Sequence, residues 1–260
     1  MVEVPFFKYQ GTGNDFVIID NRQQPFSKKD TKLFAALCDR RFGVGADGVI
    51  LLENHTGADF KMVYFNSDGQ ESTMCGNGGR CLTAFAKQLG IITDRAVFEA
   101  VDGMHTATIA GDGLVSLQMI DVQSIQVLDN HVFTDTGSPH HVQLTDNLDH
   151  LDVVDQGRRL RYDIYGDTGS NINFVQPLGH STFKVRTYER GVEDETLSCG
   201  TGVTAVALAM HNTQHTSATV VQIKTQGGDL QVSFEPAPQG YKNIWLTGPA
   251  QLVFTGSFLW

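Results

Sequence analysis

No apolar run in this 260-residue sequence approaches the length of a membrane-spanning helix. The first six residues, Met1 to Phe6, lack the basic and apolar regions of a secretory signal peptide. Both absences argue against a membrane as partner. We therefore expect a protein of the cytoplasm.

Basic residues are also scarce, with 19 lysines and arginines against 29 aspartates and glutamates. The formal net charge is −10 at pH 7, and the basic residues form no cluster. Nucleic acids and anionic membrane surfaces attract basic patches. The charge balance therefore argues against both as partners, and it says little about small substrates.

Cysteine occurs only four times. In a chain of this length without a signal peptide, we expect thiols rather than two disulfides. No Cys-x-x-Cys pair occurs, so the sequence predicts no metal site. We interpret two of the cysteines as core residues: Cys38, on a helix predicted from about Thr31 to Arg41, and Cys81.

Short segments rich in β-branched and aromatic residues recur along the whole chain between turn residues. In the first half these predicted strands are Phe16–Asp20, Val49–Leu52, Phe60–Phe65, Ala96–Ala100, Thr106–Ile109 and Leu114–Met119. In the second half they are Asn171–Val175, Phe183–Tyr188, Thr219–Lys224, Leu230–Phe234 and Asn243–Leu246. They do not alternate regularly with helices, so a doubly wound parallel sheet is not expected.

The length suits one large domain or two ordinary ones, and 41% hydrophobic with 18% charged residues is typical of a globular protein. Each half has many predicted strands and one prominent helix. The join lies near Gln118 to Val122, and a last strand over Ala250 to Phe258 is able to return to the first domain. We therefore expect one domain over residues 1–118 with 249–260 and a second over 119–248.

One short phrase occurs in both halves, as Cys75-Gly76-Asn77-Gly78 and as Cys199-Gly200-Thr201-Gly202. A glutamate stands four residues before each cysteine, at Glu71 and Glu195. A lone Cys-Gly-x-Gly is a weak signal, because cysteine is often a small buried hydrophobe and glycine often shapes a turn. Two copies, one in each half, favour chemistry that needs two matched groups.

A helix is predicted after each phrase. The first places Cys81, Leu82, Phe85 and Leu89 on one apolar face, and the second, from Val203 to Met210, is apolar almost all round. Both cysteines therefore lie at helix N-termini, where the helix dipole favours thiolate over thiol. The N–H groups of the first turn make each helix start an anion site.

Other polar motifs accompany the thiols along the sequence. The segment Gly11 to Phe16 precedes a strand rather than a helix, so it is a turn that offers the Asn14 amide and not a dinucleotide fingerprint. Glu189 and Arg190 end a strand shortly before Cys199 and suit an ammonium group and a carboxylate. The alternative is a solvated surface pair. His140 is able to shift the pKa of a thiol, although adjacent histidines are more often structural or exposed.

Six motifs, in this order, resemble those of the diaminopimelate epimerase family over nearly the whole chain. They are Gly13 to Phe16, Phe65 to Gly69, Cys75 to Arg80, Pro139 with His140, Tyr188 to Gly191, and Glu195 to Gly202. The resemblance implies an α+β fold of two similar domains. Each would be a mostly antiparallel, β-barrel-like sheet wrapped around a central helix, with the active site in the cleft between the domains.

The resemblance also implies an activity. Members of this family interconvert LL- and meso-2,6-diaminopimelate without a cofactor, in lysine and peptidoglycan precursor biosynthesis, and a homodimer is expected. Their catalytic cysteines correspond to Cys75 and Cys199, and their pKa-modulating pair to His140 and Glu189. Their substrate contacts correspond to Asn14, Asn66, Gly76, Asn77, Ser138, Asn171, Glu189, Arg190, Gly200 and Thr201, with no metal ligand.

Two positions depart from the best-known family pattern. Ser138 replaces the asparagine of Asn-Pro-His and still offers one hydrogen-bond donor. Gly48 follows Asp47 where some members have glutamine, and it offers no side chain. Both departures concern recognition of the distal end of the substrate.

A reaction mechanism can be formulated from the two thiols alone. Inverting a stereocentre that bears hydrogen requires one group to remove a proton and another to deliver one to the opposite face, so one cysteine is thiolate while its partner is thiol. A proline or hydroxyproline epimerase shares this logic. A thiol redox protein and an anion-binding module are the alternatives from other classes.

Overall fold

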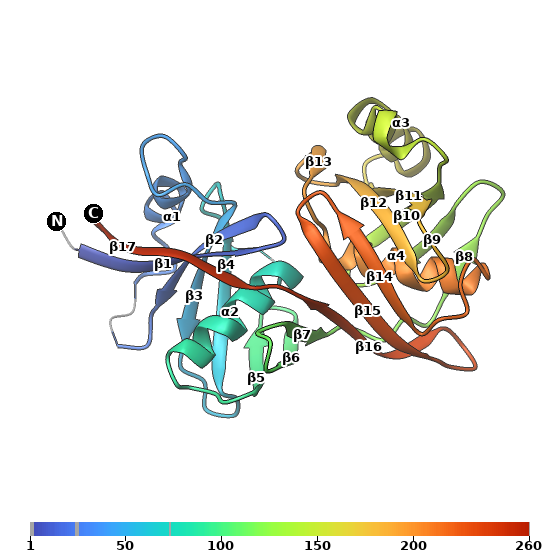
Figure 1. Cartoon of the computed structure of the whole chain (residues 1–260). Coiled ribbons are helices and arrows are strands. Elements are labelled where there is room, and N and C mark those ends of the chain that lie inside the picture. Colours follow the sequence, from blue (N-terminus) through green and yellow to red (C-terminus); the bar gives the residue numbers. More distant parts are fainter. Residues whose placement is uncertain (1–2, 24–25, 73, 260) are drawn as a thin grey trace. The chain divides into compact units, whose positions relative to one another are not determined.

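The computed structural model describes residues 3–23, 26–72 and 74–259 (Figure 1). The chain divides into two compact units, Met1–Leu117 with Gly248–Trp260, and Gln118–Thr247. Met1, Val2 and Trp260, which the sequence analysis assigned to the first domain, lie outside the described residues. None of the helices in the described ranges is long and apolar enough to cross a membrane.

The first unit contains two helices and strands from both ends of the chain. The helices are α1 (Thr31–Cys38) and α2 (Gly76–Gln88). The strands are β1 (Glu3–Gly11), β2 (Asn14–Asp20), β3 (Gly48–Glu53), β4 (Phe60–Asn66), β5 (Arg95–Ala100), β6 (Gly103–Ile109), β7 (Val115–Gln118) and β17 (Gln251–Leu259). The last strand, β17, pairs antiparallel with β1 (Figure 1).

The second unit also contains two α-helices, α3 (Val153–Tyr165) and α4 (Gly200–Asn212), and a short 3-10 helix, η1 (Leu148–His150). Its strands are β8 (Ile125–Val127), β9 (Val132–Asp135), β10 (Pro139–Leu144), β11 (Asn171–Pro177), β12 (Thr182–Glu189), β13 (Asp194–Thr196), β14 (Val220–Thr225), β15 (Gly228–Pro236) and β16 (Tyr241–Gly248).

The two units repeat one order of strand pairing. In the first, β1–β2, β3–β4, β5–β6 and β6–β7 are antiparallel, whereas β2–β3 and β4–β5 are parallel. In the second, β9–β10, β11–β12, β14–β15 and β15–β16 are antiparallel, whereas β10–β11 and β12–β14 are parallel. Each parallel pair is joined through a helix, because parallel strands need a crossover connection. The predicted α+β class with two similar, mostly antiparallel domains is confirmed.

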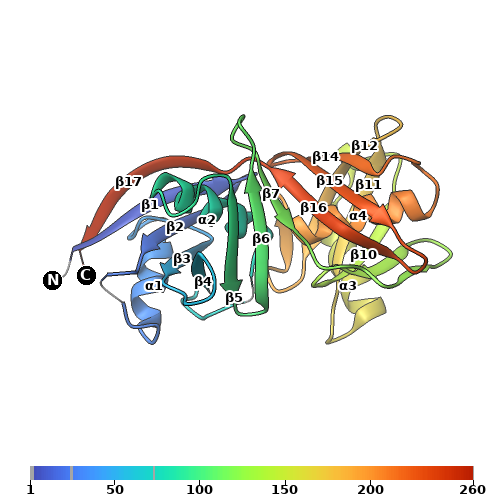
Figure 2. The ribbon, with the colours of Figure 1, turned by 90° about the horizontal axis from the view of Figure 1, so that it is seen from below.

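One helix of each unit lies among the strands of that unit (Figure 2). Helix α2 contacts β1, β2, β3 and β6, and α4 contacts β9, β10, β11, β14 and β15. Every residue of α4 from Val203 to Met210 is buried, as its apolar sequence predicts. Gly78 lets α2 approach the sheet, since a Cβ there would lie 3.0 Å from Ile50 Cδ1.

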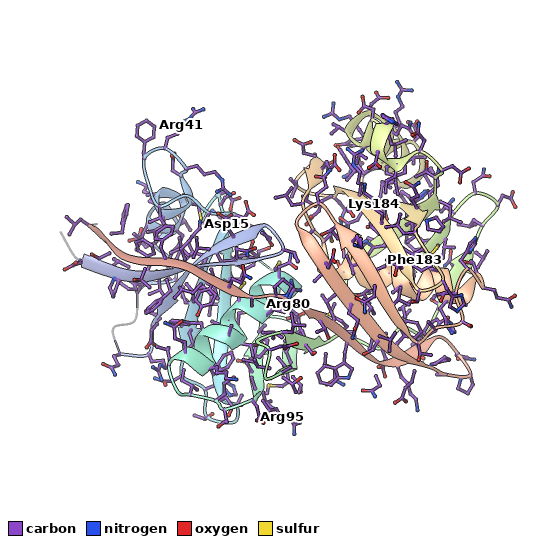
Figure 3. All side chains as sticks on the ribbon, in the orientation of Figure 1. Asp15, Arg41, Arg80, Arg95, Phe183 and Lys184 are labelled. Carbon is purple, nitrogen blue, oxygen red and sulfur yellow. The ribbon has the colours of Figure 1, made fainter. Side chains whose placement is uncertain are left out.

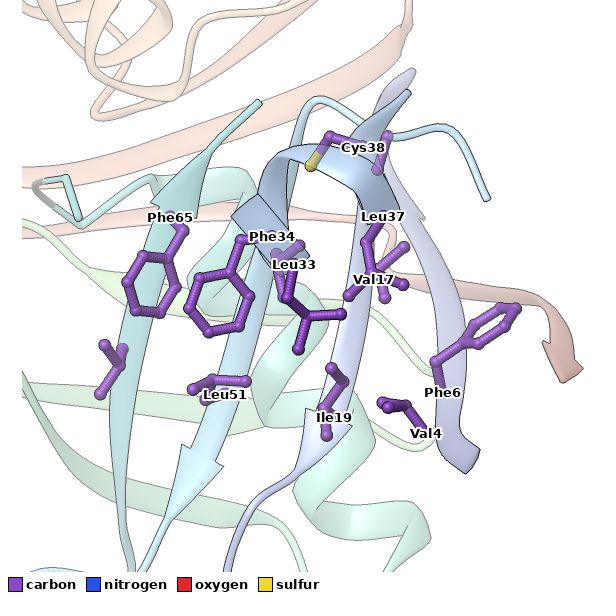
Figure 4. Close-up of a cluster of buried hydrophobic side chains, with 13 residues drawn as sticks. Val4, Phe6, Val17, Ile19, Leu33, Phe34, Leu37, Cys38, Leu51 and Phe65 are labelled. Atoms are coloured by element: carbon purple, nitrogen blue, oxygen red, sulfur yellow. The ribbon is translucent and has the colours of Figure 1, made fainter. Parts of the chain in front are cut away.

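The other helix of the first unit covers the opposite side of β3 and closes a cluster of buried side chains (Figure 4). The rings of Phe34 and Phe65 stack in this cluster with their centroids 4.0 Å apart. The N-cap of the helix is Asp30, whose carboxylate accepts from the Leu33 N–H, and the helix ends at Cys38. The prediction that it extends to Arg41 was wrong, because the Asp39 carboxylate accepts from the next N–H groups and forms a turn.

Helix α3 has no counterpart among the predicted elements. Five of its 13 residues are charged, and only Val153, Gly157 and Arg161 are buried. It packs on β11 and β12, where a Cβ on Gly157 would lie 2.4 Å from Tyr188 Cβ. Glycine disfavours helix in isolation, so the packing of this face outweighs local propensity. Strands β1, β8, β9, β10 and β13 were also not predicted.

Candidate active site

Cys75 and Cys199 hold the same position in their units, as N-caps of the central helices α2 and α4. Both have extended backbones, with φ −103° and ψ 126° at Cys75 and φ −122° and ψ 112° at Cys199. Their carbonyl oxygens accept the first helical bonds, from Gly79 at 2.8 Å and Val203 at 2.9 Å. The predicted location of both cysteines at helix N-termini is confirmed.

Neither helix carries an acidic residue in its first turn. The N–H groups of that turn have no intrahelical acceptor, and the helix dipole adds partial positive charge. No nearby carboxylate of the helix itself competes for them. Each helix start is therefore suited to an external anion such as a substrate carboxylate.

The thiol of Cys75 lies beside the Asn14 side chain, with Sγ 3.4 Å from Oδ1. Asn14 follows a sharp turn in which Thr12 and Gly13 adopt φ of 52° and 84°, and this turn brings β2 to the start of α2. Asn77 donates to the same Oδ1 at 3.2 Å, while Asn14 Nδ2 donates to Asp47 Oδ2 at 2.6 Å. The Asn14 amide is thus held with its oxygen toward the thiol.

A group of charges holds Asp47 in place. Arg40 bonds to both Asp47 and Asp15, at 2.8 Å and 2.7 Å, and Lys8 lies 2.7 Å from Asp15. Burial by itself would raise the pKa of Asp15, but the hydrogen bonds and charges of Arg40 and Lys8 outweigh it and lower the pKa to about 2. These pairs fix the segment that orients Asn14, in which Asp15 is labelled in Figure 3.

Steric crowding explains why the residue at position 48 is glycine. A Cβ built there would lie 2.4 Å from Tyr64 Cε2 and 2.9 Å from Tyr64 Oη, so the tyrosine ring occupies the space of a side chain. Gly48 is also the register partner of Asn66 on the neighbouring strand. The Phe65 carbonyl oxygen would lie only 2.5 Å from the same Cβ, so both the tyrosine ring and the neighbouring backbone require glycine at position 48.

Cys199 is buried, with 8% of its surface exposed, and its Sγ lies 3.4 Å from Thr201 Oγ1. Thr136 donates to the Thr201 carbonyl at 2.8 Å and ties the first turn of α4 to the end of β9. A Cβ on Gly202 would lie 2.5 Å from Asn173 Oδ1 and 3.4 Å from Cys199 Sγ. Glycine at this position of the phrase therefore allows the close approach of β11 to the helix start.

His140 is fully buried on β10, with Nδ1 3.1 Å from Asn173 Nδ2. The Asn173 amide is oriented by two further bonds, to the His141 carbonyl at 2.9 Å and from Thr187 Oγ1 at 3.0 Å. This orientation makes His140 Nδ1 an acceptor and places the ring proton on Nε2. Burial, together with the charge of Arg190, lowers the pKa of His140 to about 3, so the ring is neutral.

Ser138, Asn171 and Arg190 come together in the second unit, where β10 and β11 begin and β12 ends. Asn171 Nδ2 donates to Ser138 Oγ at 2.9 Å, and its Oδ1 accepts from the Arg190 N–H at 2.9 Å. The exposed Arg190 guanidinium donates to the Thr168 carbonyl at 2.9 Å, and Glu189 accepts from Thr196 Oγ1 at 2.9 Å. Glu189 and Arg190 thus bond to different partners.

The glutamates four residues before the cysteines differ in role. Glu195 forms a two-pronged ion pair with Arg186, with both N···O distances 2.6 Å, whereas Glu71 forms a backbone β-bridge with Phe65. The repeat therefore does not extend to a shared contact of these two glutamates. Sequence reasoning assigned no role to Arg80, although this residue ends the motif that begins at Cys75. It missed Thr136 and Asn173 because neither spacing nor residue type marks them before the fold is known.

The two-unit fold is shared with solved structures of low sequence identity. They include a phenazine biosynthesis protein of the PhzF family from Bacillus anthracis, with a TM-score of 0.81, 13% identity and full coverage of both chains. A hydroxyproline epimerase from Agrobacterium vitis has a TM-score of 0.70, 15% identity, and coverage of 98% of this chain and 92% of that one. These likenesses define the fold class.

Sequence comparison defines the family within this fold. The sequence pattern described as diaminopimelate epimerase matches residues 6–125 and 132–253. The diaminopimelate epimerase of Flavobacterium psychrophilum is 59% identical over 249 residues, which cover 95% of this chain and 97% of that protein. That of Chlorobaculum tepidum is 41% identical over 95% of this chain and 98% of its own. The chain belongs to the diaminopimelate epimerase family.

The state of His140 generates a prediction about pH. Its pKa of about 3 in the folded protein lies below the ordinary value of 6.5, so the unfolded chain binds more protons between these values. Its contribution to the free energy of unfolding is therefore complete above about pH 6.5 and is lost as the pH falls toward about 3. Spectra of histidine-labelled protein, assigned with His140→Gln, should show a neutral ring protonated on Nε2. A protonation midpoint near 6.5 would contradict the burial argument.

Proposed function

We propose that this protein is an isomerase that interconverts LL- and meso-2,6-diaminopimelate, in lysine and peptidoglycan precursor biosynthesis. One observation carries the proposal: in each unit a cysteine is the N-cap of the central helix. The 59% identity to a diaminopimelate epimerase supports the choice of substrate over proline or hydroxyproline.

Cys75 and Cys199 are the two proton carriers of the proposed reaction. The thiolate of one removes the α-proton, and the thiol of the other delivers a proton to the opposite face of the same carbon. In the reverse direction the two exchange roles. Since they share one negative charge in every resting form, they titrate as a coupled pair.

The α-proton of an amino acid is very weakly acidic, and in this proposal no cofactor accepts the electrons. The developing charge is stabilised instead by the N–H groups at the starts of α2 and α4, which bind the α-carboxylate. The residues that provide these groups are Gly76, Asn77, Gly200 and Thr201. The absence of acidic residues from both first turns supports this role.

The remaining candidate residues recognise the polar groups of the substrate. Arg190 offers an exposed, planar guanidinium to a carboxylate, and Glu189 offers a carboxylate to an ammonium group. Asn14, Asn66, Ser138 and Asn171 supply amide and hydroxyl groups. His140 and Glu189 form the proposed pKa-modulating pair, in which neutral His140 acts as a hydrogen-bond donor rather than as a cation.

We also propose that residues 1–118 with 249–260 and residues 119–248 are the two epimerase domains, that the site uses both, and that the protein acts in the cytoplasm. The proposed assembly is a homodimer. Strand β17 supports it, since Leu252, Val253, Phe254 and Leu259 are between 42% and 64% exposed.

Light scattering is expected to give twice the mass of one chain. Phe254→Glu should shift the protein toward the monomer, because it places a charge on the apolar surface of β17. Lys242→Glu, an exposed change on β16, is the control and should leave the mass unchanged. A monomeric wild-type protein at micromolar concentration would refute the dimer.

The activity is tested by turnover of LL-diaminopimelate in deuterium oxide. We expect deuterium at the α-carbon of the product, because the delivered proton comes from a thiol that exchanges with solvent. Proline and hydroxyproline, offered under the same conditions, should not be epimerised. Deuterium in proline alone would assign the enzyme to the alternative substrate, and no exchange in any amino acid would leave a redox or anion-binding role.

Single cysteine variants test the two proton carriers. Cys75→Ala and Cys199→Ala should each lower kcat by roughly 10²–10⁴-fold or more, because each removes one of two obligatory acid–base groups. Cys38→Ala is the matched control: its thiol is buried at the C-terminal end of α1, so the change should cost only about 0.5–3 kcal/mol of stability. Activity near that of the wild type in either single variant would eliminate the two-base mechanism.

A further inference from the structure

Arg80, labelled in Figure 3, is a fully buried arginine and the fifth residue of α2, the helix whose N-cap is Cys75. Its Nη2 donates to Asn77 Oδ1 at 3.0 Å and to Thr12 Oγ1 at 3.3 Å. Its Nε and Nη1 are buried and have no hydrogen-bond partner among the described residues. No carboxylate pairs with it in the described part of the chain. Burial lowers the pKa of Arg80, but a guanidinium remains protonated in proteins.

A buried charge without a counter-ion is strongly unfavourable, so the groups that face Arg80 decide what balances it. From α2 these are the thiols of Cys75 and Cys81, and Tyr9 on β1 interacts in turn with Cys81. Burial raises the pKa values of Cys81 and Tyr9 to about 12, so both are neutral at physiological pH. Cys75 is the remaining group of this set that is able to carry negative charge.

The carboxylates closest to this region along the hydrogen-bond network are those of Asp15 and Asp47. Both are bonded to Arg40, and Asp15 is also paired with Lys8. Their charges are therefore balanced by cations other than Arg80. The positive charge of Arg80 is left to act on the thiol end of the helix.

A chain of hydrogen bonds joins Arg80 to that thiol. Arg80 bonds to the Asn77 oxygen, Asn77 Nδ2 donates to Asn14 Oδ1 at 3.2 Å, and Cys75 Sγ lies 3.4 Å from the same oxygen. Because Arg80 fixes which end of the Asn77 amide is the acceptor, it also fixes the donor that Asn77 directs toward Asn14.

The helix that follows the second copy of the cysteine phrase has no buried arginine at the corresponding position. The residue that corresponds to Arg80, five positions after Cys199, is Thr204. It is uncharged and donates to the Gly200 carbonyl of its own helix at 3.0 Å. The two helix starts are alike in backbone but differ in the buried charge behind them.

We propose that Arg80 is a positioning residue that makes Cys75 the more acidic of the two proposed catalytic thiols. It does so through its buried positive charge, which favours the thiolate of Cys75 over the thiol. The inference rests on the proposed function in that it takes Cys75 as one of the proton carriers. It adds that the carriers are unequal at rest, with the shared negative charge favouring Cys75 over Cys199 before substrate binds.

The experiment follows the rate of iodoacetamide alkylation against pH, with Cys75 quantified by peptide mapping, in a Cys199→Ala background. Arg80→Met removes the charge and keeps an apolar side chain of similar length, a change that buried ion sites tolerate well. We expect the apparent pKa of Cys75 to rise and its alkylation rate at pH 7 to fall by about 10-fold or more, since an opposite charge nearby shifts a pKa by about 1–3 units.

Arg80→Lys is the second variant. It retains the charge and loses the planar fork to Asn77 and Thr12, so the pH profile of Cys75 should stay close to that of the parent. In a background with both cysteines, the same variant should lower kcat/KM, because Asn77 and Asn14 are no longer aligned. Circular dichroism and thermal unfolding identify the folded variants, and Arg80→Gln replaces Arg80→Met if the latter does not fold.

Cys199 provides the matched control. In a Cys75→Ala background, Arg80→Met should leave the alkylation profile of Cys199 unchanged. An unchanged profile of Cys75 in folded Arg80→Met, or an equal shift of both cysteines, would overturn the proposal. Alkylation needs no substrate, so failure of the proposed function would appear separately, as the absence of epimerisation by the wild type.

Discussion

A helix leaves its first N–H groups without acceptors inside the helix itself, and each unit of this protein is arranged around one such helix start. Cysteine is the N-cap in both, and a glycine two residues into the helix allows strands to approach closely, at Gly78 and at Gly202. Because no acidic residue stands in either first turn, the partial positive charge of the helix end is available to a thiolate or a carboxylate.

Neighbouring residues that are not proposed proton carriers hold the polar groups around the helix starts in single orientations. Asp47 and Asn77 fix the Asn14 amide beside Cys75, and Asn173 fixes the proton of His140 on Nε2. Such networks keep donors and acceptors aligned before a ligand arrives, which lowers the reorganisation that a reaction requires. The duplicated fold therefore provides two similar helix N-termini, each with a cysteine N-cap. Residues that occur in one unit only, such as the buried Arg80, make the two thiols unequal.

Much of the fold could be predicted from sequence, since alternating β-branched segments and the apolar helical runs after each cysteine are local signals. Helix α3 was missed because its stability comes from packing of Gly157 on Tyr188 and not from local propensity. Helix α1 ended early because Asp39 captures the next N–H groups. Strands β8 and β13 are too short to leave a pattern.

The sequence by itself determined that two cysteines lie at helix N-termini, because the phrase and the helix that follows are contiguous along the chain. Only the tertiary structure decided which groups surround them. Arg80 reads as an ordinary basic helix residue until the strands bury it, and Tyr64 fills the space beside Gly48 from a neighbouring strand. Burial and charge pairing depend on residues far apart in sequence, so desolvation and the pKa values that follow from it emerge only with the fold.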